Sequence, residues 1–180
     1  MSLANGAQAY GVVTRVLHWT VALLILVLIA LGWWMVGLSY YDRWYLDALE
    51  THKALGMIAL ALGSAKAMWY LGHQKVAFAA GVRRWERIAA RSVHGAFLVL
   101  MVLIPCTGYL ISTSAGDGIA MFGLFDVPAL VARDERVRDL AIAVHFYAAY
   151  AIGVLALLHA GAALKHQFLD KDGTLRRMLW

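Results

Sequence analysis

HFYAAYAIGVLALLH, residues 145–159, is a hydrophobic run with a histidine at each end. As an α-helix it would rise about 21 Å, just under four turns, so the rings of His145 and His159 would project from nearly the same face at two depths of a membrane. Ionisable side chains at such depths are costly and are generally functional. A pair placed in this way indicates a helix that holds two haem irons, one near each side of the bilayer.

The composition of the whole chain is that of an integral membrane protein. Of its 180 residues, 62% are hydrophobic and only 15% are charged, whereas soluble domains carry about 25% charged residues. Four segments are long and apolar enough to cross a bilayer, at about 12–38, 53–72, 90–115 and 138–167. The brief connections between them favour an all-α, up-and-down four-helix bundle with a single domain over residues 1–180.

The N-terminal segment bears on whether the chain is processed, and the cysteine content bears on which cofactors it could hold. The first apolar segment exceeds twenty residues and is followed by no small-residue cleavage pattern, so we expect it to be retained rather than removed as a signal peptide. Cys106 is the single cysteine, which excludes a disulfide and a thiolate metal cluster within the chain. The C-x-x-C-H motif does not occur, so any haem is expected to be b-type, without thioether links.

The distribution of charge predicts the orientation of the helices. Both termini, the connection 69–91 and the adjoining helix ends carry eleven Lys and Arg residues against three acidic residues, whereas the other two connections carry five against eight. Cytoplasmic loops concentrate cations, so both termini are expected in the cytoplasm. Each basic cluster adjoins a span, where anionic lipid explains it better than nucleic acid does, and we expect no nucleic-acid partner.

With this orientation, five histidines fall at two depths. His52 and His145 are the two expected near the outer side. His159 is expected near the inner side together with His18 and His94, and spacing alone does not choose which of these two is its partner. A lone buried histidine is more often bonded to a backbone carbonyl, but five imidazoles at two matched depths favour haem ligation, because desolvated imidazoles without a metal are costly.

Groups of residues along nearly the whole chain carry a family resemblance: Arg15-Val-Leu-His18-Trp19, His52-Lys-Ala-Leu-Gly56, His94 with Pro105 and Gly108 downstream, and His145 with His159 and Lys165-His166. Their order and spacing resemble the bacterial cytochrome b561 family of di-haem inner-membrane proteins. The resemblance implies that two haem b groups are bound. It also implies that His18 and His159 ligate the inner iron, and that His52 and His145 ligate the outer one.

Two residues of the second span are expected to contact haem. Gly56, one turn after His52, matches a glycine of the family; a small residue there would let a porphyrin plane approach the backbone, or would serve ordinary helix packing. Lys66 follows His52 by fourteen residues, on the same face but at the depth of the inner haem. Its ammonium group would pair with a haem propionate or extend to the cytoplasmic headgroups.

Three residues near the inner haem are candidates for a quinone site: His94, Lys165 and His166. His166 follows His159 by seven residues and would face the same way about 10 Å nearer the cytoplasm. There it could hydrogen-bond quinone and deliver protons, with Lys165 beside it. A histidine at a helix end is also common without any such role.

The expected coordination indicates electron transfer. An iron with histidine on both axial positions has no open site for oxygen chemistry, so the protein should pass single electrons. The resemblance implies a superoxide:quinone oxidoreductase that oxidises superoxide at the periplasmic face and reduces ubiquinone. Positive charge would attract superoxide, and it could come from Lys53, Arg43 and the cluster at 133–138, although the outer connections are net acidic.

Two other functions fit the same sequence. A non-enzymatic cytochrome b subunit would relay electrons between a partner dehydrogenase or cytochrome and the quinone pool. A structural or transport protein would contain no haem at all.

The outer connection 116–139 has turn signals that predict a loop with a short amphipathic helix at about 129–138. Across the functions considered, the expected partners are membrane lipid, ubiquinone, superoxide and a redox partner protein.

Overall fold

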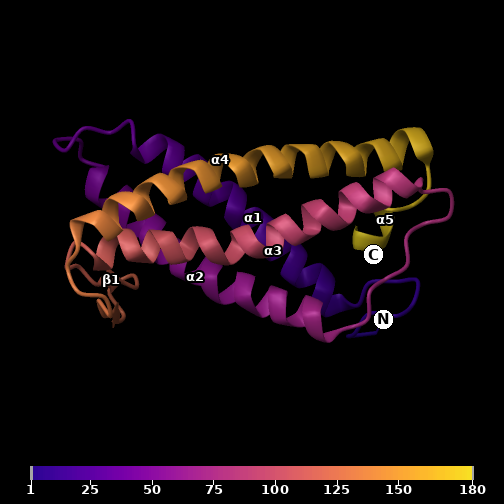
Figure 1. Ribbon diagram of the computed structural model, residues 1–180, viewed down its shortest axis with the longest axis horizontal. Helices are drawn as coiled ribbons and strands as arrows, with labels where there is room; N and C mark the ends of the chain where they lie inside the picture. Colours follow the sequence, from indigo (N-terminus) through magenta and orange to yellow (C-terminus); the bar gives the residue numbers. More distant parts are fainter. Residues whose placement is uncertain (1, 180) are drawn as a thin grey trace.

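Four long helices make up most of the chain in the computed structural model, which describes residues 2–179 (Figure 1). They are α1 (Val12–Met35), α2 (Tyr45–Gly72), α3 (Arg84–Thr113) and α4 (Glu135–Lys165). A π-helical turn, η1 (His166–Asp170), continues α4, and a short α5 (Arg176–Leu179) follows. Each long helix has the length and composition to cross a membrane. The prediction of an all-α membrane four-helix bundle is confirmed.

The helix boundaries differ from those expected. α2 begins at Tyr45 rather than near residue 53, α3 at Arg84 rather than near 90, and α4 at Glu135 rather than near 138. α1 ends at Met35, three residues early, and α3 ends at Thr113, two residues early. Hydropathy detects the lipid-embedded part of a helix, whereas backbone hydrogen bonding carries the helix on through polar residues.

Polar side chains fix where two of the helices begin. Before α4, the Asp134 carboxylate accepts hydrogen bonds from the backbone N–H groups of Arg136 (2.9 Å) and Val137 (3.2 Å). At the start of α3, Glu86 Oε2 accepts from the backbone N–H of Arg83 at 2.9 Å. These bonds satisfy N–H groups that have no partner within the first helical turn.

The helices pack in sequence order, and α4 closes the bundle against α1. The N- and C-terminal ends lie at one end of the molecule, and β1 lies at the other (Figure 1). Val21 of α1, Met101 of α3 and Ile152 of α4 form the buried hydrophobic cluster. Because Ile152 lies seven residues from both His145 and His159, this cluster occupies the middle of the bundle, between the two histidine levels.

The connection between α3 and α4 contains a hairpin instead of the amphipathic helix expected at 129–138. β1 (Ile119–Ala120) pairs antiparallel with β2 (Asp126–Val127). Ile119 is only 2% exposed, and β1 contacts α2 and α3, so the hairpin is packed onto the bundle. Residues 129–134 are irregular, and 135–138 form the first turn of α4, because the Asp134 cap starts the helix there.

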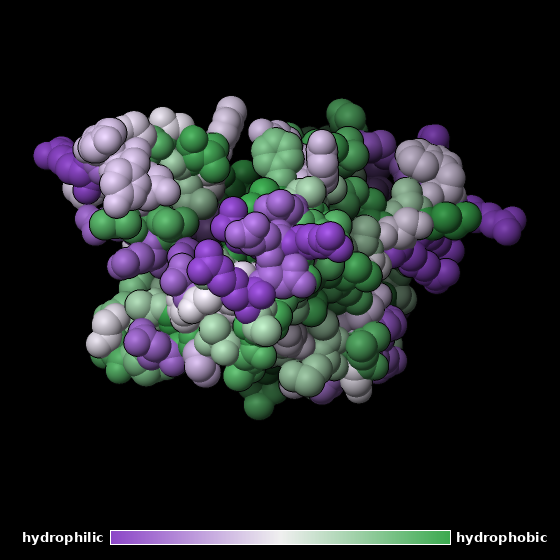
Figure 2. Space-filling view, turned by 60° about the vertical axis from the view of Figure 1, so that its left-hand side comes forward, coloured by the Kyte–Doolittle hydropathy of each residue, from purple (hydrophilic) through white to green (hydrophobic). Residues whose placement is uncertain are grey.

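The surface divides into a polar end and apolar flanks. Figure 2 brings the end that carries β1 forward and shows hydrophilic residues gathered near the centre of the view, with hydrophobic residues over much of the surrounding surface. Large hydrophobic side chains are exposed on all four long helices, among them Leu23, Met68, Val99 and Leu157. Such flanks match lipid as a solvent, whereas a soluble monomer rarely exposes so large an apolar surface.

Candidate functional site

Two pairs of imidazoles lie between the helices, one pair at each level of the bundle. At the level nearer the β1–β2 hairpin, which we call the outer level, the ring centres of His52 on α2 and His145 on α4 are 6.2 Å apart. At the inner level, the ring centres of His18 on α1 and His159 on α4 are also 6.2 Å apart. A metal–imidazole bond is about 2.0–2.1 Å long, so two imidazoles on opposite sides of one metal ion have ring centres about 6 Å apart. Both pairs therefore have the spacing of two axial ligands on one iron.

The outer ring of His145 is oriented by α3. Its Nδ1 donates a hydrogen bond to the backbone carbonyl oxygen of Ile104 at 2.9 Å, and Thr107 Oγ1 lies 3.2 Å from the same nitrogen. A carbonyl oxygen can only accept, so this contact places the proton on Nδ1 and leaves the lone pair of Nε2 available for a metal. The arrangement is typical of a metal-ligating histidine held by a backbone carbonyl.

Glycines of neighbouring helices make room for both outer rings. A Cβ atom added at Gly108 would lie 3.2 Å from Cε1 of His145, and one added at Gly32 would lie 3.1 Å from Cε1 of His52. Both distances are shorter than ordinary van der Waals contact, so a larger residue would push the ring aside. Nδ1 of His52 is buried and has no hydrogen-bond partner among the described residues, which leaves this ring less firmly oriented than that of His145.

The inner level contains a third imidazole. The ring of His94 on α3 meets the ring of His159 edge to face, with centres 5.5 Å apart, and Phe97 contacts His159 from the same helix at 5.6 Å. The His94–His159 separation is shorter than the 6.2 Å between His18 and His159. The spacing therefore favours His18 as the partner of His159, with His94 packed beside the pair.

Lys66 and Gly56, the two residues of α2 expected to contact haem, have different surroundings in the structure. Lys66 is half-buried on α2 and follows His52 by fourteen residues, about 21 Å along the helix, which corresponds to the inner level. A Cβ atom added at Gly56 would meet no protein atom within 4 Å. The space beside Gly56 is compatible with a flat ring system against the backbone.

Three of the expected outer cations have identifiable surroundings. Lys53 follows His52 directly and is half-buried. The guanidinium group of Arg43 lies over the ring of Trp44, 4.8 Å from its centroid, and Arg138 lies beside Asp139, with Nε 3.9 Å from Oδ1. The Arg138–Asp139 contact is a long ion pair between partly exposed side chains and not a hydrogen bond. Lys53 is the expected cation nearest to the outer histidines in sequence.

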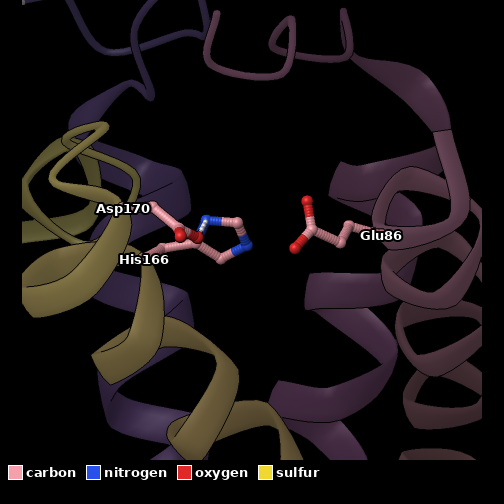
Figure 3. A group of neighbouring side chains, drawn as sticks. All are labelled: Glu86, His166 and Asp170. Carbon is pink, nitrogen blue, oxygen red and sulfur yellow. Dashed lines mark ion pairs between the residues drawn. The ribbon is translucent and has the colours of Figure 1, made fainter. Parts of the chain in front are cut away.

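Lys165 and His166 belong to a polar cluster at the end of the bundle that carries both termini (Figure 1). Figure 3 draws three members of this cluster, Glu86, His166 and Asp170. Lys165 Nζ lies 2.9 Å from Glu86 Oε1 and 2.5 Å from Asp170 Oδ2. Nδ1 of His166 lies 2.7 Å from Asp172 Oδ2 and 3.0 Å from Asp170 Oδ2. One ligand atom from each of Glu86, His166 and Asp170 could converge on a cation, but the Lys165 ammonium group already bonds two of the three residues. The arrangement is a hydrogen-bonded ion-pair network that ties η1 to α3.

The network borders a polar cavity of about 200 Å³, lined by residues 80–83 together with Glu86, His166, Asp170 and Asp172. Burial alone would raise the pKa of the Asp172 carboxyl group, but hydrogen bonds from Thr174 and His166 outweigh it, so the pKa lies below the usual value. Asp172 therefore stays ionised. His94 lies eight residues from Glu86 along α3, about 12 Å away, so the three quinone-site candidates fall into two separate places.

Sequence reasoning missed several residues of these sites. Glu86 pairs with Lys165 across 79 positions of sequence, and the carbonyl group of Ile104 meets His145 across 41. Gly32 carries no motif that points to His52. Short-range patterns hold no signal for such contacts, because they depend on how two helices are rotated against each other.

Comparison with known proteins finds relatives along nearly the whole length of this chain. Residues 9–180 match the family model described as prokaryotic cytochrome b561. The chain is 41% identical over 179 residues to cytochrome b561 homolog 2 of Escherichia coli (strain K12), a match that covers 99% of this chain and 95% of that protein. It is 26% identical over 167 residues to cytochrome b561 homolog 1 of the same organism, covering 91% and 92% of the two chains.

Proposed function

This chain belongs to the prokaryotic cytochrome b561 family of haem b-binding membrane electron carriers, and from that premise we propose that it binds two haems and oxidises superoxide with ubiquinone as acceptor. In this reaction two superoxide ions each lose one electron and leave as oxygen. One ubiquinone takes up both electrons and two protons and leaves as ubiquinol. The protein would lie in the bacterial inner membrane with both termini in the cytoplasm.

The observation that carries the two-haem proposal is the repeated 6.2 Å separation of imidazole rings at two levels. α4 contributes one histidine to each level, and their fourteen-residue spacing separates the levels by about 21 Å along the helix. Bound between His52 and His145 and between His18 and His159, two haems would supply reversible one-electron transfer. The cluster of Val21, Met101 and Ile152 keeps water out of the space between the levels.

At the outer level, the protein's part is to hold the imidazoles and to admit a small anion. The Ile104 carbonyl group fixes the His145 tautomer, so that Nε2 faces the ligand position without a change of protonation. Lys53, next to His52, supplies positive charge on the side where superoxide would approach. We assign Lys53 a role in attracting the anion.

At the inner level, the protein's part is to supply protons for ubiquinol formation. His166 lies in the wall of the polar cavity and is bonded to two carboxylates. An imidazole in that position can take a proton from the aqueous side and pass one onward. We assign His166 to proton delivery and Lys165 to holding Glu86 and Asp170 in place, with His94 as a hydrogen-bonding candidate for quinone nearer the haem.

A second function is favoured by the character of the outer end. The outer connections are net acidic, and Phe122, Leu124 and Phe125 in the hairpin are 55%, 83% and 61% exposed. A surface of this kind suits a protein partner better than it suits an anion. In that case the protein would relay electrons from a partner dehydrogenase or cytochrome to quinone.

The deciding experiment follows reduction of a ubiquinone analogue by the purified, haem-loaded protein during a steady supply of superoxide. We expect rapid reduction of the haem bands and then quinol formation above the rate of enzyme-free dismutation. Lys53→Gln should slow haem reduction by superoxide, whereas Arg84→Gln, at the opposite end of the bundle, should not. Intact haems that superoxide does not reduce would reject superoxide oxidation and favour the partner relay.

A further inference from the structure

Buried polar atoms without a partner gather near the proposed haem ligands. Such atoms are rare in folded proteins, and each calls for an explanation. Within residues 2–179, the buried side-chain nitrogen and oxygen atoms that lack a hydrogen-bond partner are Arg15 Nε, His52 Nδ1, Ser112 Oγ, Ser114 Oγ and Arg138 Nε. Two of the five are Nε atoms of half-buried arginines, Arg15 and Arg138. The Arg138 side chain is 42% exposed, so its Nε–H group is shielded although part of the side chain reaches the surface. A shielded N–H group of a charged side chain needs an acceptor, and a carboxylate or phosphate oxygen suits it best.

Arg15 lies on α1 three residues before His18, on the same side of the helix and about 4.5 Å nearer the cytoplasmic end. Its Nε atom is buried, and the described residues offer it no acceptor. The guanidinium group therefore stands one helical turn to the aqueous side of an inner haem ligand, with a hydrogen-bonding requirement that the protein does not meet.

Arg138 stands in the equivalent relation to the outer site. It precedes His145 on α4 by seven residues, which is nearly two turns on the same face and about 10 Å nearer the outer end. Asp139 Oδ1 is 3.9 Å from Arg138 Nε and the Asp139 side chain is 74% exposed, so this contact is too long for a hydrogen bond. The Nε–H group of Arg138 remains without an acceptor.

Ser112 adds a second donor at the outer level. It follows Gly108 on α3 by one turn, and Gly108 is the residue in contact with the His145 ring. Ser112 is 4% exposed and its hydroxyl group has no partner. Arg138 and Ser112 therefore approach the outer site from two neighbouring helices, both on the aqueous side of His145.

We propose that Arg15 binds a propionate carboxylate of the inner haem and that Arg138, with Ser112, binds a propionate of the outer haem. The proposal rests on the two-haem part of the proposed function. A carboxylate needs a cation at low dielectric, and the planar guanidinium fork matches its two oxygens. Because each arginine lies on the aqueous side of its histidine, the propionates of the two haems face opposite membrane surfaces. A lipid phosphate is the other anion that could satisfy these arginines.

The first test uses the full-length wild-type chain, produced without haem and then loaded with either haem b or its dimethyl ester, in which both carboxylates are blocked. Loss of a charge-assisted bond at each site should weaken binding of the ester by roughly 10- to 100-fold. Equal binding of haem and ester would overturn the proposal and would be the result expected if the arginines bound lipid phosphate. Fewer than two haems per wild-type chain would instead reject the proposed function.

The second test measures the midpoint potential of each haem in Arg15→Gln and Arg138→Gln. A nearby cation favours the reduced iron, so Arg15→Gln should lower the potential of the inner haem alone, and Arg138→Gln that of the outer haem alone. The matched controls are Arg84→Gln at the cytoplasmic end and Arg136→Gln at the outer end, two residues from Arg138 on a different face. Unchanged potentials in both variants would refute the assignment. If either glutamine variant fails to fold, Arg15→Lys or Arg138→Lys is measured in its place. Lysine keeps the positive charge, so the midpoint potential of the neighbouring haem should change little.

Discussion

A single residue, His145, shows how a metal ligand is prepared by its surroundings. The Ile104 carbonyl group fixes its tautomer, and Gly108 leaves the ring its space. Both residues belong to α3, whereas His145 belongs to α4, so the orientation of the ligand depends on how these two helices pack. His159, fourteen residues further along α4, is met instead by His94 and Phe97. The two histidines of one helix are therefore supported in different ways.

Removal of one ligand should remove one haem. We expect His145→Ala to lose the outer haem and His18→Ala to lose the inner haem, each leaving roughly half of the haem content, because a b-type haem has no thioether link to retain it. Haem per chain and the spectrum of the remaining haem measure the outcome. Loss of the inner haem in His94→Ala, with its retention in His18→Ala, would show that the inner pair is His94 and His159.

A substitution that crowds the His145 ring without removing it should weaken binding of the outer haem without abolishing it. In Gly108→Ala the new methyl group would lie 3.2 Å from Cε1 of His145, so the ring must move and affinity for the outer haem should fall roughly 10-fold. Gly153→Ala on α4 is the matched control, because its methyl group would meet Ile29 at an ordinary 3.8 Å. Equal haem affinities in the two variants would show that the contact at Gly108 has no role in positioning His145.

Among the helices, α4 is the element that joins the two sites, and it is fixed at both ends. At its start the Asp134 carboxylate caps the first turn. At its end Lys165 forms an ion pair with Glu86 of α3, and the helix continues as the π-helical turn η1. Because the two histidines share one helix, a shift of α4 against its neighbours would displace both rings.

Loss of the cap should loosen the outer end of α4. Asp134→Ala removes two hydrogen bonds and should cost about 1 kcal/mol, which for a chain of this size lowers the melting temperature by about 2–4 °C. Thermal unfolding in detergent, followed by circular dichroism, measures the change. Asp117→Ala, which removes an exposed carboxylate from the same connection, should leave the melting temperature unchanged; a similar fall in both variants would point to a general effect of charge.

The whole molecule is a bundle with both termini at one end and the β1–β2 hairpin at the other (Figure 1). The basic residues are concentrated at the end that carries the termini, and the acidic residues predominate at the hairpin end. Four membrane-spanning helices place both termini on the same side of the membrane. The charge asymmetry favours the cytoplasm as that side, which would put the hairpin in the periplasm.

Reporter fusions test this orientation. A fluorescent protein fused after residue 179 should fold and fluoresce in the cytoplasm, whereas alkaline phosphatase fused at the same place should be inactive. Alkaline phosphatase inserted after Gly123, in the hairpin turn, should be active because it reaches the oxidising periplasm. The opposite pattern would invert the molecule and exchange the sides assigned to superoxide and to proton uptake.

The sequence by itself determined the membrane class, the four spans and the two histidine levels, because hydropathy and helical spacing are properties of neighbouring residues. It did not determine where the helices end, nor the hairpin in place of a helix at 129–138. Helical spacing left His18 and His94 open as partners of His159 and the family resemblance favoured His18; the tertiary structure adds the ring distances, 6.2 Å for His18 and 5.5 Å for His94. Only the tertiary structure revealed the pairing of Glu86 with Lys165 and the unpartnered nitrogens of Arg15 and Arg138. These features depend on the rotation and tilt of each helix against its neighbours, which are set by side-chain packing between residues far apart in the chain.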